Sequence, residues 1–193
     1  MLAGALEADY TLESDPEPAS SSAGAAPDEV PAVRTTQQQE LVAGQNVPLA
    51  GPRVQVDLLV SDADLSVLLV GASGRVERDE DFIFYNNPRS ADGAVTLTGN
   101  GASIDTSRLS QRYEGAVLVV SGGDAPVADA TGVLSQPDGE SHFRFSPADS
   151  APVSALVWGE LYLRNGHWRL RAVGQGWVDG LAGVARDYGV DVD

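Results

Sequence analysis

Short apolar segments separated by turn residues fill the chain from Glu40 to about residue 175. Several of them alternate apolar and polar positions, as strands do when one face of a sheet is buried. Glycine, proline, aspartate and asparagine gather between them, where tight turns need those residues. Many short strands at this spacing predict an all-β, two-sheet β-sandwich. The predicted strands are Arg53–Val60, Leu65–Val70, Phe82–Tyr85, Val95–Leu97, Gly115–Val120, His142–Phe145, Leu156–Leu163 and His167–Val173.

Two segments predict a buried strand and a hairpin within these sheets. Leu65–Val70 is almost entirely apolar, which indicates a strand that is buried on both faces. Asn165–Gly166 lies between two alternating segments, the pattern of a two-residue hairpin with a type I′ turn. After that turn His167 alternates with Arg169 and Arg171, so we expect its imidazole to face solvent.

One segment near the C-terminus has the periodicity of a helix. Within Val178–Gly189, apolar residues recur at helical spacing and would form one apolar face. Gly189 is a suitable stop, because glycine adopts the left-handed conformation that ends many helices. We therefore predict one C-terminal helix, which covers an edge of the sandwich through Leu181 and Val184.

The alternation also predicts interior residues. It shows which side chains share a face of a strand, but not which of the two faces points inward. The expected core residues are Val67, Leu69, Ile83, Tyr85, Val117, Val119, Leu161, Leu170 and Val173.

Residues 1–38 differ in composition from the rest of the chain. The stretch Glu13–Arg34 holds four prolines and five acids among many small residues. Such a segment has too little apolar surface to offset the entropy lost on ordering. We therefore predict a disordered, acidic N-terminal tail over 1–38 and a folded domain over 39–193.

Composition narrows the classes of function. The chain has 28 acidic and 12 basic residues, a formal net charge of −16, and all its basic residues are arginine. A surface with this net negative charge repels phosphate backbones and anionic lipids, which argues against nucleic acid as a partner and against direct insertion into a membrane. The lack of cysteine excludes disulfides and thiolate metal sites, and two histidines cannot form a multi-histidine zinc site. No secretory signal pattern is visible at the N-terminus, so we expect a cytoplasmic protein.

Two acidic pairs flank the predicted strand Leu65–Val70. Asp62 and Asp64 precede it, and Asp79 and Asp81 follow it after a glycine-containing turn. We expect this turn to fold the chain into a hairpin that brings both pairs toward the same end of a sheet.

Asn86 and Asn87 follow the next predicted strand and add amide oxygens. Carboxylate and amide oxygens suit Ca²⁺, which takes about six to eight such ligands. The predicted metal ligands are therefore Asp62, Asp64, Asn86 and Asn87, with Asp79 and Asp81 as further ligands. The spacing of these ligands is not that of an EF-hand. We predict no catalytic residues, because the chain lacks a serine elbow and a glycine-rich phosphate-binding loop.

Two long motifs resemble those of a known family. The segment Asp79–Asn100, DEDFIFYNNPRSADGAVTLTGN, resembles the TerD-type family of bacterial tellurium-resistance and calcium-binding stress proteins. Trp158–Val192 is similar to the end of those proteins, and Leu41–Leu49 to their opening strand. The resemblance covers about Glu40 to Val192 and implies the same β-sandwich that the pattern predicts.

The resemblance also implies a calcium site. Asp62 and Asp64 occupy the family's DxD position, and Asn86 and Asn87 occupy its YNN position. The family's next loop is rich in Asp and Glu, whereas this chain has GASID at Gly101–Asp105. Fewer carboxylates attract a divalent cation less strongly. We therefore expect at most one Ca²⁺, weakly held.

The sequence thus predicts a non-enzymatic, TerD-like stress-response module. It would act through protein partners, bound by the N-terminal segment or by exposed sheet edges. Two alternatives stay open. One is a purely structural subunit that has lost metal binding, and the other is a metal-dependent hydrolase built on the same carboxylates.

Overall fold

The computed structural model describes residues 38–60, 62–122, 126–127, 130–138, 141–147 and 152–191. The predicted tail over 1–38 lies outside these residues, apart from Gln38.

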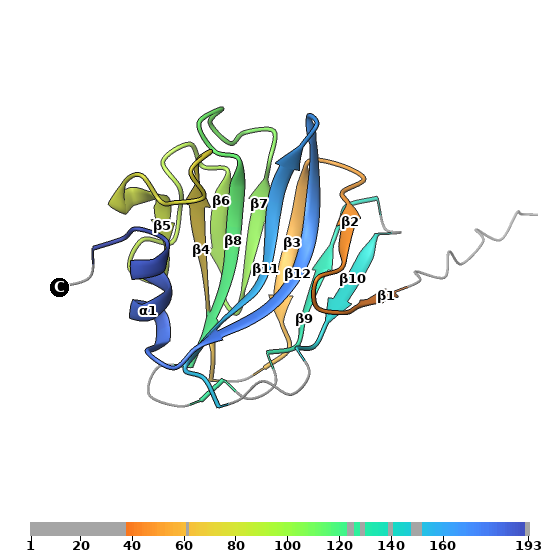
Figure 1. The fold of residues 1–193 in the computed structure, drawn as a ribbon. Coiled ribbons are helices and arrows are strands. Elements are labelled where there is room, and N and C mark those ends of the chain that lie inside the picture. Colours follow the sequence, from red (N-terminus) through yellow and green to blue (C-terminus); the bar gives the residue numbers. More distant parts are fainter. Residues whose placement is uncertain are drawn as a thin grey trace, which may run out of the picture. The chain divides into compact units, whose positions relative to one another are not determined.

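Within the described residues, twelve strands form two six-stranded sheets that pack face to face (Figure 1). The first sheet has the order β1-β10-β9-β3-β7-β6 and the second β2-β12-β11-β8-β4-β5. Neighbouring strands are antiparallel, except for the parallel pair β1 and β10. The predicted all-β, two-sheet sandwich is confirmed.

The elements have the following bounds. The first sheet consists of β1 (Gln38–Leu41), β3 (Arg53–Leu58), β6 (Val95–Thr98), β7 (Gly101–Asp105), β9 (Gly132–Ser135) and β10 (His142–Phe145). The second consists of β2 (Asn46–Pro48), β4 (Asp64–Val70), β5 (Phe82–Ile83), β8 (Gly115–Ser121), β11 (Ala155–Arg164) and β12 (His167–Trp177). A 3-10 turn, η1 (Asp79–Asp81), precedes β5, and the helix α1 (Gly180–Asp187) follows β12.

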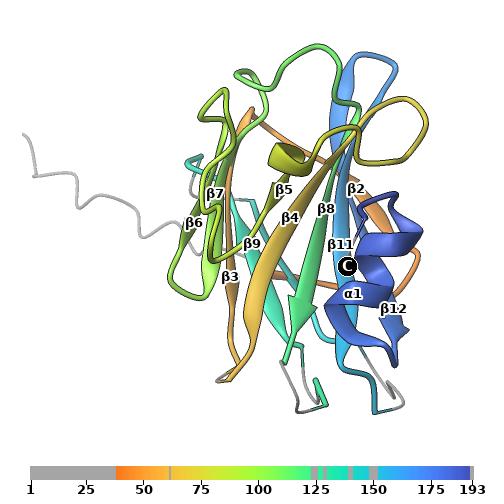
Figure 2. The same ribbon diagram turned by 90° about the vertical axis from the view of Figure 1, so that its left-hand side faces the viewer.

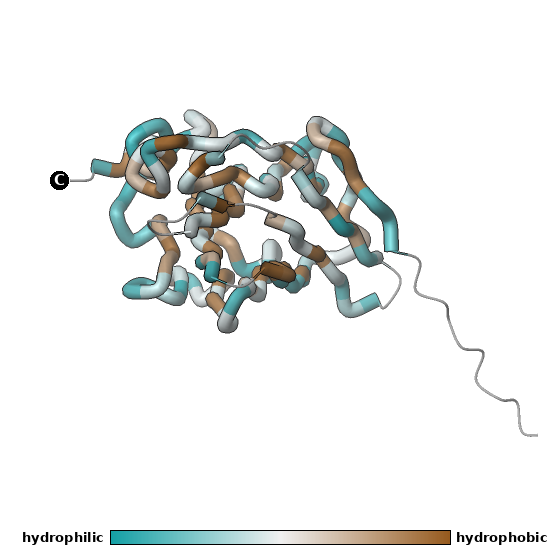
Figure 3. The backbone as a smooth tube through the Cα atoms, turned by 90° about the horizontal axis from the view of Figure 1, so that it is seen from below, coloured by the Kyte–Doolittle hydropathy of each residue, from teal (hydrophilic) through white to brown (hydrophobic). Residues whose placement is uncertain are grey.

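The main core lies between the two sheets. In the first sheet apolar side chains point inward and polar ones point outward, so that β3 buries Val54 and Val56 but exposes Arg53. The second sheet contributes alternate residues of its central strands to the same core, among them Leu118 of β8. Figure 3, which views the molecule from below, shows hydrophobic segments of both layers toward the middle.

A second apolar cluster lies on the other face of the second sheet. Leu68 and Val70 of β4 belong to it, whereas Leu65, Val67 and Leu69 belong to the main core. Val184 and Ala185 of α1 complete this cluster, and Figure 2 shows the helix against that face. β4 is therefore buried on both faces, as its continuous apolar sequence predicted.

The helix forms close to its predicted position. Its apolar face packs on the second sheet through Val184, which is fully buried, and through Leu181, which is partly buried. It ends before Gly189, whose φ of 87° is the left-handed conformation expected of the stop residue. The N–H of Val190 then donates to the carbonyl of Ala185 at 2.8 Å.

The predicted hairpin turn is also present. Asn165 and Gly166 both have positive φ, 52° and 76°, and join paired residues Arg164 and His167. These values fit the type I′ turn that the Asn-Gly pair favours. His167 is exposed, as expected.

One predicted core residue is wrong and two face an unexpected side. Tyr85 is 72% exposed, because β5 ends at Ile83 and the chain then turns, so the alternation of a strand does not continue. Val117 and Val119 are fully buried, but in the cluster beneath α1 rather than between the sheets. Val173 is only partly buried there, and the other predicted residues of the strands lie in the main core.

Truncation of Val184 tests the packing of the helix. We expect Val184→Ala to lower the free energy of unfolding by about 2 kcal/mol, because it removes fully buried methyl groups and leaves a cavity. Leu181→Ala should lower the free energy of unfolding by less than the same substitution at a fully buried leucine, since Leu181 is only partly buried. Val178→Ala is the control, because Val178 is 75% exposed and its loss should change stability by less than about 0.5 kcal/mol. Equal effects of Val184→Ala and Val178→Ala in urea unfolding would contradict the packing.

Candidate functional site

Asp62 and Asp64 lie where the chain enters β4. Both are exposed, and Asp62 has a φ of 64°, a left-handed conformation that aspartate tolerates better than most residues. Asp64 is the first residue of the strand and pairs with Ser121 of β8. The two carboxylates are thus available to solvent at one end of the second sheet.

Asn86 and Asn87 lie in a tight turn that follows β5. The backbone N–H and C=O groups of Phe84 and Asn87 bond to each other at 3.1 and 2.9 Å, which leaves Asn86 exposed at the tip. The side chain of Asn87 donates to the carbonyl of Phe82 at 2.9 Å. Since β5 runs antiparallel to β4, the chain that leaves β5 heads toward the end of β4 where Asp64 lies. The turn with Asn86 and Asn87 is therefore nearer to that end than β5 is.

Asn100 joins the same end of the fold, which the sequence did not indicate. It lies in the turn between β6 and β7, and its side-chain amide donates to the carbonyl of Val60 at 3.3 Å. Its own carbonyl accepts from the N–H of Leu58 at 3.0 Å. The turn between β6 and β7 is therefore held against the segment that leads to Asp62.

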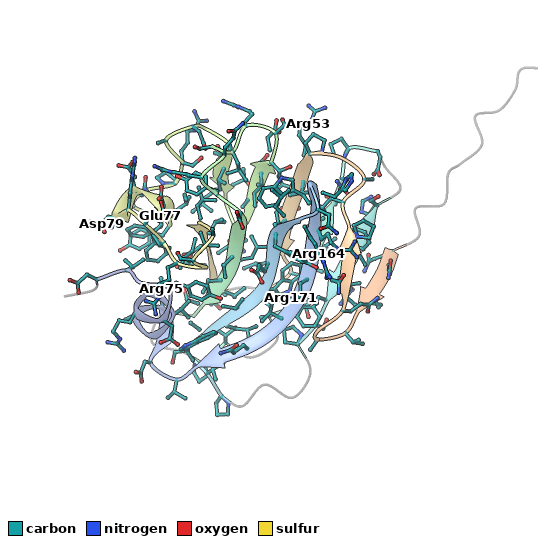
Figure 4. All side chains as sticks on the ribbon, turned by 45° about the horizontal axis from the view of Figure 1, so that its top comes forward. Arg53, Arg75, Glu77, Asp79, Arg164 and Arg171 are labelled. Carbon is teal, nitrogen blue, oxygen red and sulfur yellow. The ribbon has the colours of Figure 1, made fainter. Side chains whose placement is uncertain are left out.

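Asp79 and Asp81 lie at the opposite end of β4. They form η1, which precedes β5, and β5 pairs with β4 through Phe82 opposite Leu68. The expectation that the hairpin would unite both acidic pairs is therefore wrong. Leu68, the partner of Phe82, is four residue steps from Asp64, which separates Asp64 from the start of β5 by about 13 Å along the strand at roughly 3.3 Å per residue, and η1 lies beyond that point. Figure 4 shows Asp79 close to Glu77 on the loop between β4 and β5.

Asp81 has a different partner from the one predicted. It is 1% exposed, and its Oδ1 accepts hydrogen bonds from Arg112 Nη2 at 2.7 Å and from the Tyr113 hydroxyl. Arg112 Nη2 also donates to the Tyr113 hydroxyl oxygen, and its guanidinium lies 4.5 Å from the centre of the Tyr113 ring. The Arg112 guanidinium, rather than a metal ion, thus lies against this carboxylate and balances its charge.

This buried triad connects two loops. Asp81 belongs to the loop between β4 and β5, and Arg112 and Tyr113 belong to the segment before β8. Asp81 Oδ2 and Arg112 Nε are buried without a hydrogen-bond partner among the described residues, so the triad is only partly satisfied. The sequence signal, an Arg-Tyr pair before an apolar strand, is too common to be recognised as a site.

The triad alters the ionisation of Tyr113. Burial disfavours the phenolate, and the hydrogen bond to the Asp81 carboxylate opposes loss of the proton. Together they raise the pKa of Tyr113 to about 12, despite the opposing effect of Arg112.

The TerD domain family profile matches residues 39–122 and 126–188. The chain belongs to the TerD domain family. The match spans nearly all of both sheets and the helix.

Curated TerD-family relatives share about a third of their residues with this chain. The tellurium resistance protein TerD of Serratia marcescens is 34% identical over 151 residues, which cover 67% of this chain and 79% of that protein. General stress protein 16U of Bacillus subtilis is 31% identical over 152 residues, covering 68% and 79%. These names support a stress-response role for the family.

A solved structure supports the fold. The crystal structure of a homologue of telluride resistance protein (TerD) from Streptomyces coelicolor A3(2) is similar with a TM-score of 0.55. It is 16% identical, and the match covers 72% of this chain and 99% of that one. At this identity the likeness concerns the architecture alone.

The donor set of this TerD domain falls short of a closed calcium site. No group of three or more Asp, Glu, His or Cys side chains in the described part of the chain is placed to hold a metal ion. Asp62 and Asp64 supply two exposed carboxylates, and the nearby turns supply amides rather than acids. Calcium prefers about six to eight oxygens, so these residues do not fit a tightly bound ion.

In the described segments, no helix is both long and apolar enough to cross a membrane.

Loss of Arg112 should destabilise the domain. Arg112→Gln removes the charge partner of a buried carboxylate, and we expect a loss of about 3 kcal/mol in the free energy of unfolding. Arg78→Gln is a matched control, because the Arg78–Glu80 ion pair is exposed and should contribute less than about 1 kcal/mol. Urea unfolding of both variants measures the difference, and equal losses would show that the triad is not a stabilising contact.

The triad also predicts an alkaline loss of stability. Since the pKa of Tyr113 is raised from 10.0 to about 12 in the folded protein, its contribution is full below about pH 10 and is lost as pH rises through about 12. Tyr113→Phe should lack this part of the alkaline loss, although it is less stable at neutral pH. Tyr85→Phe removes an exposed phenol and should keep the loss. The free energy of unfolding would be measured by urea unfolding between about pH 8 and 12. If Tyr113→Phe lost as much stability at alkaline pH as wild type, ionisation of Tyr113 would not be the cause.

Proposed function

We propose that this chain is a non-enzymatic stress-response module of the TerD family, which acts through protein partners and binds calcium weakly at most. The match of the family profile over both sheets and the helix carries this proposal. The names of the relatives from Serratia and Bacillus support the stress-response part.

The weak calcium site would be centred on Asp62 and Asp64. Both carboxylates are exposed and form no ion pair with an arginine of the described residues, so a cation could reach them. Asn86 would add an amide oxygen from the turn after β5. Asp79 and Asp81 would not belong to this site, because they precede β5 near the other end of β4.

Protein partners would find few open strand edges on this domain. β5 has two residues, and β2 has three and ends in Pro48, so both are poor templates for a further strand. The edge of β6 bonds to the segment before it, through Leu97 N–H to Pro88 C=O and Ser90 N–H to Val95 C=O. The outer edge of β1 is the longest that pairs with no described strand. We therefore place the sheet-edge part of the proposal at β1.

A melting curve with calcium tests the metal part. We expect a dissociation constant on the order of 10⁻⁴ M or weaker, because the site has few carboxylates. At 1 mM Ca²⁺ the gain over EDTA should then be at most about 1.4 kcal/mol. Asp62→Asn/Asp64→Asn should abolish it.

Asp79→Asn/Glu80→Gln removes the same number of charges at the other end of β4 and should keep the calcium response. A calcium shift that survives in Asp62→Asn/Asp64→Asn would show that the site lies elsewhere. The absence of any shift in wild type would favour the purely structural alternative. Phosphoester hydrolysis with Mg²⁺ or Mn²⁺ would contradict the non-enzymatic assignment.

A further inference from the structure

The outer face of the first sheet carries a hollow of about 300 Å³ that is lined by three arginines. Its residues come from β3, β6, β7 and the loops beside them, and these three strands lie on the side of the sandwich away from α1 (Figure 2). Figure 4 shows Arg53 projecting from the rim of the fold where β3 begins. The lining residues that matter here are Arg53, Arg89, Arg108, Thr96, Ser103 and Asp105.

The pairing of the strands brings these residues together from distant parts of the sequence. Arg53 of β3 is directly opposite Asp105 of β7, and Ser103 of β7 is opposite Thr96 of β6. Arg89, in the segment that precedes β6 in the chain, pairs with Thr96 through an isolated β-bridge. Outward-facing side chains on neighbouring strands lie side by side, so the polar residues form a floor between the long arginine side chains.

The third arginine is held in place by the turn before β6. Arg108 Nη2 donates to the carbonyl of Asp92 at 3.3 Å. A Cβ on Gly93, whose φ is 64°, would lie 3.0 Å from that nitrogen, so the guanidinium lies against bare backbone. The Asp92 carboxylate accepts from Ser90 Oγ at 2.7 Å and from the N–H groups of Ala94 and Ser110, each at 3.0 Å. These bonds outweigh the effect of burial and lower the pKa of Asp92, so the turn keeps its charge.

The residues that line the hollow carry more positive than negative charge. Arg53, Arg89 and Arg108 form no ion pair with a described carboxylate. Asp105 offsets one of the three charges, but its Oδ1 is bound by the N–H and hydroxyl of Ser107. Five other arginines of the described residues do form ion pairs, namely Arg78, Arg112, Arg144, Arg171 and Arg186.

We infer that this hollow binds a dianion of the phosphate type. The three guanidiniums and one carboxylate that line the hollow leave a net charge that matches a dianion, and guanidiniums bind phosphate oxygens in a bidentate manner. The Asp92 carboxylate is not among the lining groups and accepts three hydrogen bonds within its own turn. The hydroxyls of Thr96 and Ser103 make no hydrogen bond within the described residues and can donate to the same oxygens. A single carboxylate of an acidic peptide would leave part of this charge unbalanced.

The negative charge of the whole chain does not prevent such binding. Exposed charges farther than about 8–10 Å are largely screened at physiological ionic strength, so the nearest groups decide the local potential. The same charge still opposes a long polyanion, which must pass over acidic surface on either side. The inference therefore concerns a small phosphate group rather than nucleic acid, and goes beyond the proposed function without depending on it.

Titration with inorganic phosphate tests the inference. Amide and arginine side-chain NMR shifts would be followed with orthophosphate at about pH 8, where most of the orthophosphate is the dianion, with chloride at equal ionic strength as reference. We expect saturable shifts at Thr96 and Ser103 with phosphate only. Arg53→Gln/Arg89→Gln should bind about tenfold more weakly or worse, because two charge-assisted contacts are lost. Asp105→Asn should bind more tightly, since it removes a repelling charge.

Arg164→Gln is the matched control. Arg164 is exposed on the β11–β12 turn and forms no ion pair with a described residue, so its loss should leave phosphate binding unchanged. Shifts that chloride reproduces, or an equal loss in Arg164→Gln, would overturn the site. Unchanged affinity in Asp105→Asn would overturn the placement of the anion over this floor.

A capped phosphoserine peptide separates the two sources of the ligand. Binding of orthophosphate and peptide alike would identify the phosphate group itself as the ligand. Binding of the peptide alone, with the same dependence on Arg53 and Arg89, would assign the site to phosphate esters. Binding of neither would overturn the inference, and it would leave the calcium test untouched because none of its residues is involved.

Discussion

Two central strands of the second sheet, β4 and β8, are buried on both faces, and much of the structure depends on this arrangement. Every residue of β8 is buried, because the first sheet covers one face and α1 with its neighbours covers the other. A strand with no solvent-facing side needs apolar residues at consecutive positions, which β4 and β8 have. The first sheet has the opposite character, since no described element covers its outer face. Its polar side chains are therefore free to form a ligand site.

An extra residue in β11 changes which of its later side chains face the main core. Val157 is opposite Val119 of β8 and Gly159 is opposite Leu118, so Trp158 has no partner in β8. This bulge reverses the alternation along the strand, since a shift of one residue turns each later side chain to the other face. Leu161 consequently points into the main core, and Glu160 points outward to Arg171. The indole of Trp158 fills the core and donates to the Phe145 carbonyl at 3.1 Å.

Charged groups in this fold divide into those that hold loops and those that remain available. Asp81 is committed to Arg112 and Tyr113, and this contact joins two loops at one end of the second sheet. Asp62 and Asp64 at the other end remain exposed, as do the arginines on the first sheet. A TerD domain built in this way presents two charged surfaces of opposite sign, the carboxylates of Asp62 and Asp64 and the arginines of the first sheet.

The sequence by itself determined the class of fold, the helix, the hairpin at Asn165–Gly166 and the family. Each of these rests on local periodicity, turn chemistry or contiguous motifs, which neighbouring residues encode directly. Tertiary structure decided how distant residues combine. The β4–β5 register separated Asp79 and Asp81 from Asp62, and the turn after Ile83 exposed Tyr85. Strand pairing likewise gathered Arg53, Arg89 and Arg108 from three separate segments. Local patterns cannot supply these results, because register and strand order follow from the packing of the whole sandwich.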